Sequence, residues 1–446
     1  MKIEKEEKLS VIVGLGKTGM SCARYFVRKG IPFAVQDSNV APTRAAELRD
    51  LAPQASLSLL NSEALCKAGV IVLSPGVPLA TREIQTAQAA GIPITGDINM
   101  FLHLVDQPIV AITGSNGKST VTALVGEILT NGGLAVGVGG NIGTPCLDLL
   151  DKRFEVFVLE LSSYQLEVVE AAGCKVAAVL NLSPDHLDRY ESAEAYYTAK
   201  ARIYKGAQVA IVNRQVNFDF KIAADTKVVS FGEDSPVHPD DYGLRVNGGR
   251  TVLMRGQKEL LTLDQMQLKG RHNAMNALAA LAICDQFAIN PVTAINTVIA
   301  YAGLPHRSEF VGIFGGAEFV NDSKATNPGA TSAAVQGLAQ PDRPMLLILG
   351  GESKGADFSA LQMVVKAHVA KVFLYGADSS LIKNALAEFV ACEEFDTLAN
   401  AIQGIATEVA PNSIVLFAPA CASFDQFDNF EHRGREFKRL VMGAFL

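Results

Sequence analysis

The chain lacks any apolar run near the roughly 20 residues that a membrane-spanning helix needs. It also lacks the pattern of a signal peptide, because the charged stretch 1–8 leads directly into a strand pattern. Its seven cysteines are an odd number and none stands in a Cys-x-x-Cys pair, which indicates free thiols in a reducing compartment. We therefore expect a cytoplasmic protein that does not insert into membranes. Tryptophan is absent as well, and its absence excludes nothing.

An excess of positive charge is also missing. The formal net charge is −7, from 39 Lys and Arg against 46 Asp and Glu. Such a balance argues against broad binding to nucleic acid or to a membrane surface. Any anionic ligand must then be held by local basic groups and by helix N-termini.

What the chain does have is length and a repeating pattern. Its 446 residues exceed a usual single core, which predicts two to four domains. The 38 glycines and 49% hydrophobic content fit a globular α/β enzyme. Short β-branched runs alternate with helical patterns, which predicts parallel sheets built from βαβ units. We expect three α/β units in series, at 1–98, 99–302 and 303–446.

The expected strands fall into three groups. They are 11–13, 34–36, 70–73 and 92–94; then 109–112, 156–159, 176–180 and 209–212; then 319–321, 345–349, 372–375 and 414–417. The stretch 225–263 is rich in Gly and Asp with short alternating runs, and we interpret it as a hairpin insertion.

The first glycine motif, Gly14-Leu15-Gly16-Lys17-Thr18-Gly19, follows a strand and opens a helix. Glycines in this pattern let backbone N–H groups at a helix N-terminus approach a pyrophosphate. Asp37 ends the next strand about 20 residues on, where an acid accepts from a ribose hydroxyl. The residues alone leave three hypotheses open: an NAD-dependent dehydrogenase, a site for another diphosphate such as UDP, and a tight turn that binds nothing.

The second motif, Thr113-Gly114-Ser115-Asn116-Gly117-Lys118-Ser119-Thr120, lies at a strand-to-helix junction. Backbone N–H groups of such a loop cradle phosphates, Lys118 would neutralise the β and γ groups, and Ser119 could ligate Mg²⁺. Ile112 occupies the first glycine position of the common pattern, so the match is incomplete. A plain glycine-rich turn with a surface lysine is the alternative, and the flanking strand and helix favour the phosphate loop.

Two polar residues follow expected strands of the same sheet. Glu160 follows 156–159, and His186 follows 176–180. The carboxyl ends of parallel strands are where α/β sites usually form, and Mg·ATP needs hard ligands beyond the loop itself. We expect both residues to have a metal role.

Lys200 lies on an expected helix, with Tyr196 four residues before it and Tyr204 four after it. Its ammonium group either reaches solvent along the aliphatic stem, which is the commoner case, or is partly desolvated. A desolvated amine could react with CO₂ to form a carbamate that ligates a second metal ion. The sequence leaves both interpretations open.

Taken together, these motifs resemble the Mur ligase family, and the resemblance spans nearly the whole chain in order. The other segments that carry it are Gly139-Gly140-Asn141-Ile142-Gly143, Glu160-Leu161-Ser162-Ser163-Tyr164-Gln165-Leu166, Pro184-Asp185-His186-Leu187-Asp188-Arg189-Tyr190, Leu304-Pro305-His306-Arg307, Asn321-Asp322-Ser323-Lys324-Ala325-Thr326-Asn327, and Ser423-Phe424-Asp425-Gln426-Phe427 through Phe430. The resemblance implies an α/β fold of three domains. These are an N-terminal Rossmann-like domain for the UDP-linked precursor, a central P-loop ATPase-type domain with a mainly parallel sheet, and a C-terminal Rossmann-like domain for the amino acid.

The resemblance also implies an ATP-dependent amide-bond ligase of peptidoglycan synthesis, and so of cell-wall biogenesis, cell shape and cell division. The carboxylate of UDP-N-acetylmuramoyl-L-alanine would attack the γ-phosphate of ATP, and D-glutamate would then displace phosphate from the acyl phosphate. Other acceptors of the group, such as L-alanine, a diamino acid or a glutamate on folate, stay open. Two Mg²⁺ ions and a monomer are expected.

The implied site residues form five sets. The catalytic residues are Lys118, His186 and Lys200, and the metal ligands are Ser119, Glu160, His186 and a carbamylated Lys200. The precursor would be bound by Leu15, Thr18, Asp37, Ser74, Gly76 and Asn141, and D-glutamate by Thr326, Lys354, Ser423 and Phe430. ATP would be bound by Gly114, Ser115, Asn116, Gly117, Lys118, Ser119, Thr120, Asn276, Arg307, Asp322 and Lys324. Asn39 departs from the basic residue that some members carry after the acid. Ligands held by three domains also imply closure, with Leu304–Arg307 near the hinge.

Overall fold

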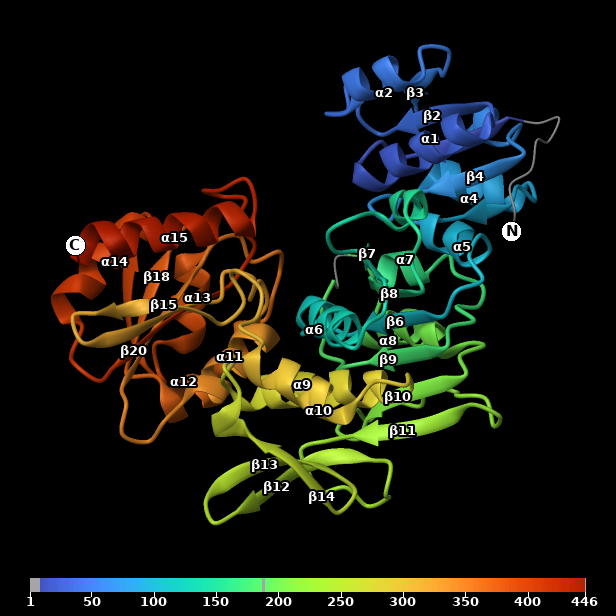
Figure 1. Ribbon diagram of the computed structural model, residues 1–446. Helices are drawn as coiled ribbons and strands as arrows, with labels where there is room; N and C mark the ends of the chain where they lie inside the picture. Colours follow the sequence, from blue (N-terminus) through green and yellow to red (C-terminus); the bar gives the residue numbers. More distant parts are fainter. Residues whose placement is uncertain (1–8, 187–188, 446) are drawn as a thin grey trace. The chain divides into compact units, whose positions relative to one another are not determined.

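The computed structural model describes residues 9–186 and 189–445 (Figure 1). The chain forms two compact units. Unit 1 comprises Met1–Leu182, Arg189–Phe231 and Ala279–Ala294, and unit 2 comprises Ser183–Asp188, Gly232–Leu278 and Ile295–Leu446. Mostly parallel sheets flanked by helices confirm the predicted α/β class.

The first sheet of unit 1 has the strand order β3-β2-β1-β4-β5, and its paired strands are parallel. The strands are β1 (Ser10–Val13), β2 (Phe33–Asp37), β3 (Leu57–Leu59), β4 (Val70–Leu73) and β5 (Ile94–Thr95). The helices are α1 (Lys17–Lys29), α2 (Ala45–Leu51), α3 (Ser62–Leu65), α4 (Arg82–Ala89) and α5 (Asp97–Leu102). β1 and β4 are buried along their whole length, which explains their continuous apolar runs. β5 begins at Ile94, two residues later than the sequence pattern predicted.

Unit 1 contributes six strands to a nine-stranded second sheet, in the order β11-β10-β9-β6-β8-β7. They are β6 (Ile109–Thr113), β7 (Val136–Gly140), β8 (Val156–Glu160), β9 (Val176–Val179), β10 (Val209–Asn213) and β11 (Lys227–Phe231). The helical segments are α6 (Lys118–Asn131), η1 (Cys146–Asp151), α7 (Ser163–Leu166), α8 (Ala193–Ala201) and η2 (Arg202–Tyr204). α9 (Arg271–Cys284) and α10 (Pro291–Ala300) contain residues of both units.

The predicted hairpin insertion at 225–263 is wrong at its start. β11 pairs in parallel with β10, because its buried residues Val229 and Phe231 continue the sheet. The antiparallel strands that follow belong to unit 2. They are β12 (Tyr242–Asn247), β13 (Arg250–Arg255) and β14 (Lys258–Thr262), followed by η3 (Leu263–Gln265).

The last sheet, also in unit 2, has the order β15-β16-β20-β17-β18-β19. Its strands are β15 (Glu309–Phe314), β16 (Ala317–Asn321), β17 (Met345–Gly350), β18 (Lys371–Tyr375), β19 (Ala391–Phe395) and β20 (Ile414–Ala420). The β15–β16 pair is antiparallel and the other pairs are parallel. The helical segments are α11 (Pro328–Leu338), η4 (Phe358–Leu361), α12 (Gln362–His368), α13 (Ser379–Leu386), α14 (Leu398–Glu408) and α15 (Phe430–Phe445).

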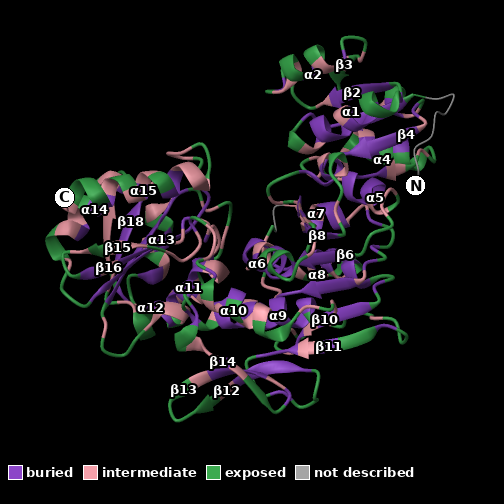
Figure 2. Ribbon diagram, in the orientation of Figure 1, coloured by how far each residue is buried: buried purple, intermediate pink, exposed green. Residues whose placement is uncertain are grey.

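The cores lie where helices cover these sheets, and Figure 2 shows the central strands as the most continuously buried elements. In unit 2 the rings of Phe417 on β20 and Phe437 on α15 stack with centroids 4.5 Å apart. Burial on both faces fixes the strands, so the loops at their carboxyl ends are held in defined positions. Among residues 9–186 and 189–445, no helix is long and apolar enough to cross a bilayer.

The turn between β1 and α1 depends on two glycines. Gly14 has φ +91°, a backbone conformation that residues other than glycine rarely adopt. A Cβ on Gly19 would stand 2.1 Å from the backbone carbonyl oxygen of Gly14, so the backbone would have to move. A Cβ on Gly16, in contrast, would meet nothing within 4 Å. The loop therefore needs glycine at its first and last positions for steric reasons of its own.

We predict that Gly19→Ala destabilises the fold by about 1–3 kcal/mol, because the added methyl group must displace backbone. Gly16→Ala is the matched control, with an open position and the same chemical change, and should lie within about 0.5 kcal/mol of the parent. Melting temperatures of the three proteins measure the difference. Equal melting temperatures for both variants would contradict the steric role of Gly19.

Candidate active site

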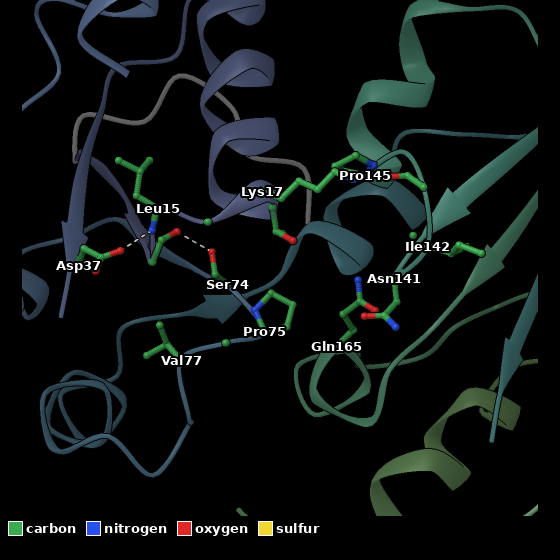
Figure 3. A pocket seen from close by; sticks show the side chains of 16 residues that line it. Leu15, Lys17, Asp37, Ser74, Pro75, Val77, Asn141, Ile142, Pro145 and Gln165 are labelled. Carbon is green, nitrogen blue, oxygen red and sulfur yellow. Dashed lines mark hydrogen bonds between the residues drawn. The ribbon is translucent and has the colours of Figure 1, made fainter. Parts of the chain in front are cut away.

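A cavity of about 440 Å³ opens in unit 1 at the loops that follow β1, β2, β4 and β7 (Figure 3). Carboxyl ends of parallel strands are where α/β proteins usually bind ligands. All six residues predicted to contact the precursor line this cavity: Leu15, Thr18, Asp37, Ser74, Gly76 and Asn141. Segments as distant in sequence as the first turn and the loop after β7 therefore form one site.

Two of these candidates also hold the cavity wall in place. The Asp37 carboxylate accepts hydrogen bonds from Leu15 N at 2.6 Å and from Asn39 N at 2.8 Å. The buried Ser74 hydroxyl donates to Gly14 O at 2.7 Å. These bonds tie β1, β2 and β4 together at the glycine turn, and Figure 3 shows the Asp37 and Ser74 bonds as dashed lines. The Asp37 carboxylate and the Ser74 hydroxyl still have lone pairs that can accept hydrogen bonds from a ligand, because these bonds use only part of their hydrogen-bonding capacity.

Glu160 joins the cavity to the 113–120 loop. It is the last residue of β8 and is buried. One carboxylate oxygen accepts from the Asn141 side chain at 2.7 Å, and the other accepts from the Ser119 hydroxyl at 2.5 Å. The predicted metal ligands Ser119 and Glu160 are thus brought together, and a precursor candidate touches the same carboxylate.

Two lysine side chains meet inside the 113–120 loop. Lys118 Nζ donates to Gly114 O at 2.8 Å and to Ser115 O at 2.9 Å. Lys200 Nζ donates to the same Gly114 oxygen at 2.9 Å. The side-chain nitrogens of Lys118 and Lys200 therefore meet at one carbonyl oxygen of the loop where the sequence predicts a phosphate.

The interpretation in which Lys200 reaches solvent is wrong. The residue is 1% exposed, and its ammonium group lies over the Tyr196 ring at 4.6 Å. Tyr196 is equally buried, and its hydroxyl lies 3.2 Å from Ser115 Oγ. The aromatic ring and the loop backbone together enclose the amine, so the desolvated interpretation is the one that fits the structure.

His186 belongs to unit 2, whereas Ser119 and Glu160 belong to unit 1. Its φ is +56°, and its backbone N–H donates to Asp185 Oδ1 at 2.9 Å. Leu187 and Asp188 of the same motif lie outside the described residues. Across residues 9–186 and 189–445, no cluster of three or more His, Cys, Asp or Glu side chains is arranged to hold a metal ion.

The remaining ATP candidates, Asn276, Arg307, Asp322 and Lys324, lie in unit 2. Burial raises the pKa of the Asp322 carboxyl to about 6, against the opposing effect of the Arg307 guanidinium. The Ser308 hydroxyl lies 3.3 Å from Asp322 Oδ2, and the backbone N–H of Lys324 donates to His306 O. The loop after β16 is thereby tied to the segment that carries Arg307. Asn276 lies on α9 and donates to Asn273 Oδ1 at 3.1 Å.

The four acceptor candidates also lie in unit 2, after β16, β17 and β20. Lys354 has φ +51°, and its Nζ lies 4.9 Å from the Phe424 ring centroid. Phe430 carries the Lys324 ammonium 4.1 Å from its ring centroid. Ser423 is buried and Thr326 is partly exposed. Three neighbouring strand ends of one sheet therefore present the acceptor set.

Comparison with known proteins decides the family. Residues 8–96 match the model of the Mur ligase MurD-like N-terminal domain, 112–284 the Mur ligase middle domain, and 306–421 the Mur ligase glutamate ligase domain. The UDP-N-acetylmuramoylalanine–D-glutamate ligase of Shigella boydii serotype 4 is 44% identical over 433 residues, 97% of each chain. The same enzyme of Hahella chejuensis is 41% identical over 445 residues, 99% of each chain.

The chain belongs to the Mur ligase family. Within it, the chain groups with the UDP-N-acetylmuramoylalanine–D-glutamate ligases. Its fold also matches the Thermotoga maritima MurF ligase solved in complex with ADP, with a TM-score of 0.62 at 16% identity, covering 99% of this chain and 97% of that one. The family and the three-domain fold class that the motifs predicted are both confirmed. Membership of this family excludes the dehydrogenase hypothesis.

The sequence analysis missed Arg433 of this Mur ligase, which is fully buried on α15. Its guanidinium donates to Ser323 Oγ and O, and to the carbonyls of Cys421 and Ala422. It therefore ties the loop of Asp322 and Lys324 to the loop of Ser423. The sequence feature that could have revealed the burial of Arg433 is its helical spacing. Position 433 lies four residues before Phe437 and eight before Val441, on the buried stripe of the helix.

Asp97 was also missed. It is 2% exposed and hydrogen-bonds the Cys146 thiol and the side chain of Gln165, which lines the cavity. Burial raises the pKa of Asp97 to about 6. A carboxyl whose pKa is higher in the folded than in the unfolded chain stabilises the fold at low pH, and that contribution is lost as pH rises through the folded pKa.

We predict that this loss is about 3 kcal/mol between pH about 4 and pH 7, from a shift of roughly two pKa units. Asp97→Asn removes the ionisation, so the stability difference between variant and parent should move in favour of the variant as pH rises over that interval. Urea unfolding at several pH values measures it, with the exposed Asp106→Asn as control. A difference that stays constant with pH would show that Asp97 does not titrate as described.

Proposed function

We propose that the protein joins D-glutamate to UDP-N-acetylmuramoyl-L-alanine with ATP, through an acyl phosphate, in the synthesis of peptidoglycan precursors. The observation that carries this is the meeting of Lys118 and Lys200 at Gly114 O, beside the Ser119–Glu160 pair. The substrates are those named for the UDP-N-acetylmuramoylalanine–D-glutamate ligases that are 41–44% identical to this chain over nearly its whole length. The free state of the cysteines fits a cytoplasmic location.

The chemistry requires two anions to approach each other. A carboxylate oxygen of the precursor forms a bond to the γ-phosphorus of ATP, and the bond to the β–γ bridging oxygen breaks to release ADP. The amine of D-glutamate then attacks the acyl carbon, loses a proton, and expels phosphate. Positive charge around the transferring phosphoryl group lowers the barrier of the first step. We assign this role to Lys118.

The oxygen ligands of the loop fit a divalent cation. Ser119 Oγ and Glu160 Oε2 are buried, hard donors 2.5 Å apart, and Mg²⁺ prefers such oxygens. We propose that they hold one Mg²⁺ and that His186 is a further metal ligand. A bound Mg²⁺ would neutralise negative charge on the phosphates. Backbone N–H groups of residues 114–120 would cradle the same phosphates.

Lys200 is assigned as the site of a carbamate. Its amine is enclosed by Tyr196 and the loop, and burial beside a second cation disfavours the charged form of an amine in general. The neutral nitrogen would add to the carbon of CO₂ and lose a proton, leaving a carboxylate-like group. That group would be an oxygen ligand for a second Mg²⁺.

We predict that Lys200→Ala lowers turnover by about 100-fold or more, the range seen when one preorganised charge-stabilising group is lost. Formate or acetate should restore part of the activity by taking the place of the carbamate oxygens. Lys205→Ala, at an exposed position nearby in sequence, is the control and should keep parental turnover. Failure of any small carboxylate to rescue a folded Lys200→Ala protein would count against the carbamate.

The other ligands are assigned by element. The cavity in unit 1 would take the UDP-linked precursor, with Leu15, Thr18, Asp37, Ser74, Gly76 and Asn141 as contacts. In unit 2, Asn276, Arg307, Asp322 and Lys324 would bind the nucleoside and phosphates of ATP. Thr326, Lys354, Ser423 and Phe430 would bind D-glutamate, with the Lys354 ammonium pairing with a carboxylate of the amino acid.

The test is phosphate release by purified protein with Mg·ATP and UDP-N-acetylmuramoyl-L-alanine, with one amino acid added at a time. We expect release that depends on D-glutamate, and a product heavier by one glutamyl residue. Release with L-alanine or L-glutamate would keep the ligase chemistry and overturn the acceptor assignment. No release with any acceptor, from folded protein that binds ATP, would overturn the proposed function.

A further inference from the structure

Arg189 is a largely buried cation that has no part in the chemistry proposed above. Its side chain is 10% exposed, and its guanidinium carbon lies 3.9 Å from the centroid of the Tyr164 ring. One guanidinium nitrogen donates to the Glu167 carboxylate at 2.7 Å. Another donates to the backbone carbonyl of Pro75, also at 2.7 Å. The side chain therefore links the chain around α7 to the loop that follows β4.

The α7 side of this link has a defined position. Tyr164 lies on α7, and Glu167 is the C-cap residue of the same helix. The Tyr164 ring also stacks with the ring of Tyr190, with centroids 6.1 Å apart. The next residue along, Val168, packs against the apolar core of the first sheet. Arg189 is thus held by an aromatic face and a carboxylate that are themselves fixed.

The other end of the link is a turn in the cavity wall. Pro75 lies between Ser74 and Gly76, and all three line the cavity, with Pro75 labelled in Figure 3. The N–H of Val77 donates to Ser74 O at 3.0 Å, which closes a β-turn with Pro75 and Gly76 at its centre. In a planar trans peptide, the carbonyl of one residue and the N–H of the next point in opposite directions. A bond to Pro75 O therefore also sets the direction of the Gly76 N–H.

This turn does not have the orientation that its sequence favours. Proline followed by glycine is typical of a type II turn, in which the glycine has φ of about +80°. Gly76 does not have a positive φ, so its central peptide does not have the type II orientation. A Cβ at position 76 would meet nothing within 4 Å, so close packing there does not hold the peptide. The bond from Arg189 to Pro75 O holds it instead.

We propose that Arg189 is a positioning residue of the precursor site, which acts by fixing the Pro75–Gly76 peptide. With Pro75 O held, the Gly76 N–H keeps the direction in which it meets the UDP-linked precursor, whose identity rests on the proposed function. Without the bond, the turn is free to adopt the orientation typical of Pro-Gly. Precursor binding then has to reverse that orientation, and the apparent affinity falls by the fraction of turns that are competent.

The test is steady-state kinetics of the full chain, with the precursor varied at saturating ATP and D-glutamate. We expect Arg189→Met to raise KM for UDP-N-acetylmuramoyl-L-alanine by about 10-fold and to leave kcat within about 3-fold, because the turn affects binding of the precursor and not the transfer of phosphate. Arg189→Lys keeps a cation beside Glu167 but has one nitrogen in place of the guanidinium fork. It should therefore raise the same KM by about 3-fold or more, with kcat again little changed.

Arg202→Met is the matched control. It makes the same change in net charge, and Arg202 donates to the backbone carbonyl of Glu167 at 2.6 Å, but this side chain is exposed and does not contact the turn. Its KM for the precursor should be parental. A parental KM in Arg189→Met, a fall in kcat without a rise in KM, or an equal rise in Arg202→Met would overturn the proposal.

The lysine variant decides the question if Arg189→Met does not fold, because it retains the ion pair with Glu167. A parental KM in Arg189→Lys would show that charge alone suffices and would overturn the role of the bond to Pro75 O. If the parent protein ligates no amino acid to the precursor, the proposed function fails instead, so the two failures are distinct.

Discussion

The carbonyl oxygen of Gly114 accepts hydrogen bonds from two buried or half-buried lysine side chains, and the candidate phosphate site depends on that arrangement. A chain with net charge −7 has no general attraction for ATP or for a UDP-linked acid. Local geometry must therefore provide the attraction. The fold does so by placing Lys118 at the start of α6, and the Mg²⁺ ions proposed for Ser119, Glu160 and a carbamylated Lys200 of α8 would add positive charge there.

Glu160 provides the second constraint in unit 1. Its two oxygens bind Ser119 of the 113–120 loop and Asn141 of the cavity wall, so one side chain positions both ligand regions. The strand that carries it, β8, lies between β6 and β7 and is buried throughout. The backbone N–H of Asn141 also donates to Glu160 O at 2.8 Å, which fixes the loop independently of the side chain. A rigid strand end is a suitable support for groups that must meet the same substrate.

Much of the fold and of the candidate site in unit 1 could be predicted from the sequence, because apolar strands followed by glycine or polar motifs place functional groups at strand ends. Glu160 and Lys118 were predicted in this way, whereas the six cavity candidates were implied by the resemblance to the Mur ligase family. β7 was missed because Gly137, Gly139 and Gly140 have low strand propensity. Close packing against Phe154, Phe157 and the carbonyls of Thr144 and Glu160 nevertheless requires these glycines. β11 was assigned to a hairpin since its neighbours are rich in turn residues. The burial of Lys200 could not be derived, because it depends on Tyr196 and on a loop more than 80 residues earlier.

The most direct test of the acyl-phosphate account is positional isotope exchange in ATP labelled with ¹⁸O at the β–γ bridging oxygen. The protein is incubated with Mg·ATP and UDP-N-acetylmuramoyl-L-alanine but without D-glutamate, and the label is followed by ³¹P NMR. The account predicts that the label moves to nonbridging β-positions, because reversible acyl-phosphate formation frees the β-phosphate of ADP to rotate. No movement of label, in a preparation that ligates D-glutamate when it is added, would contradict it.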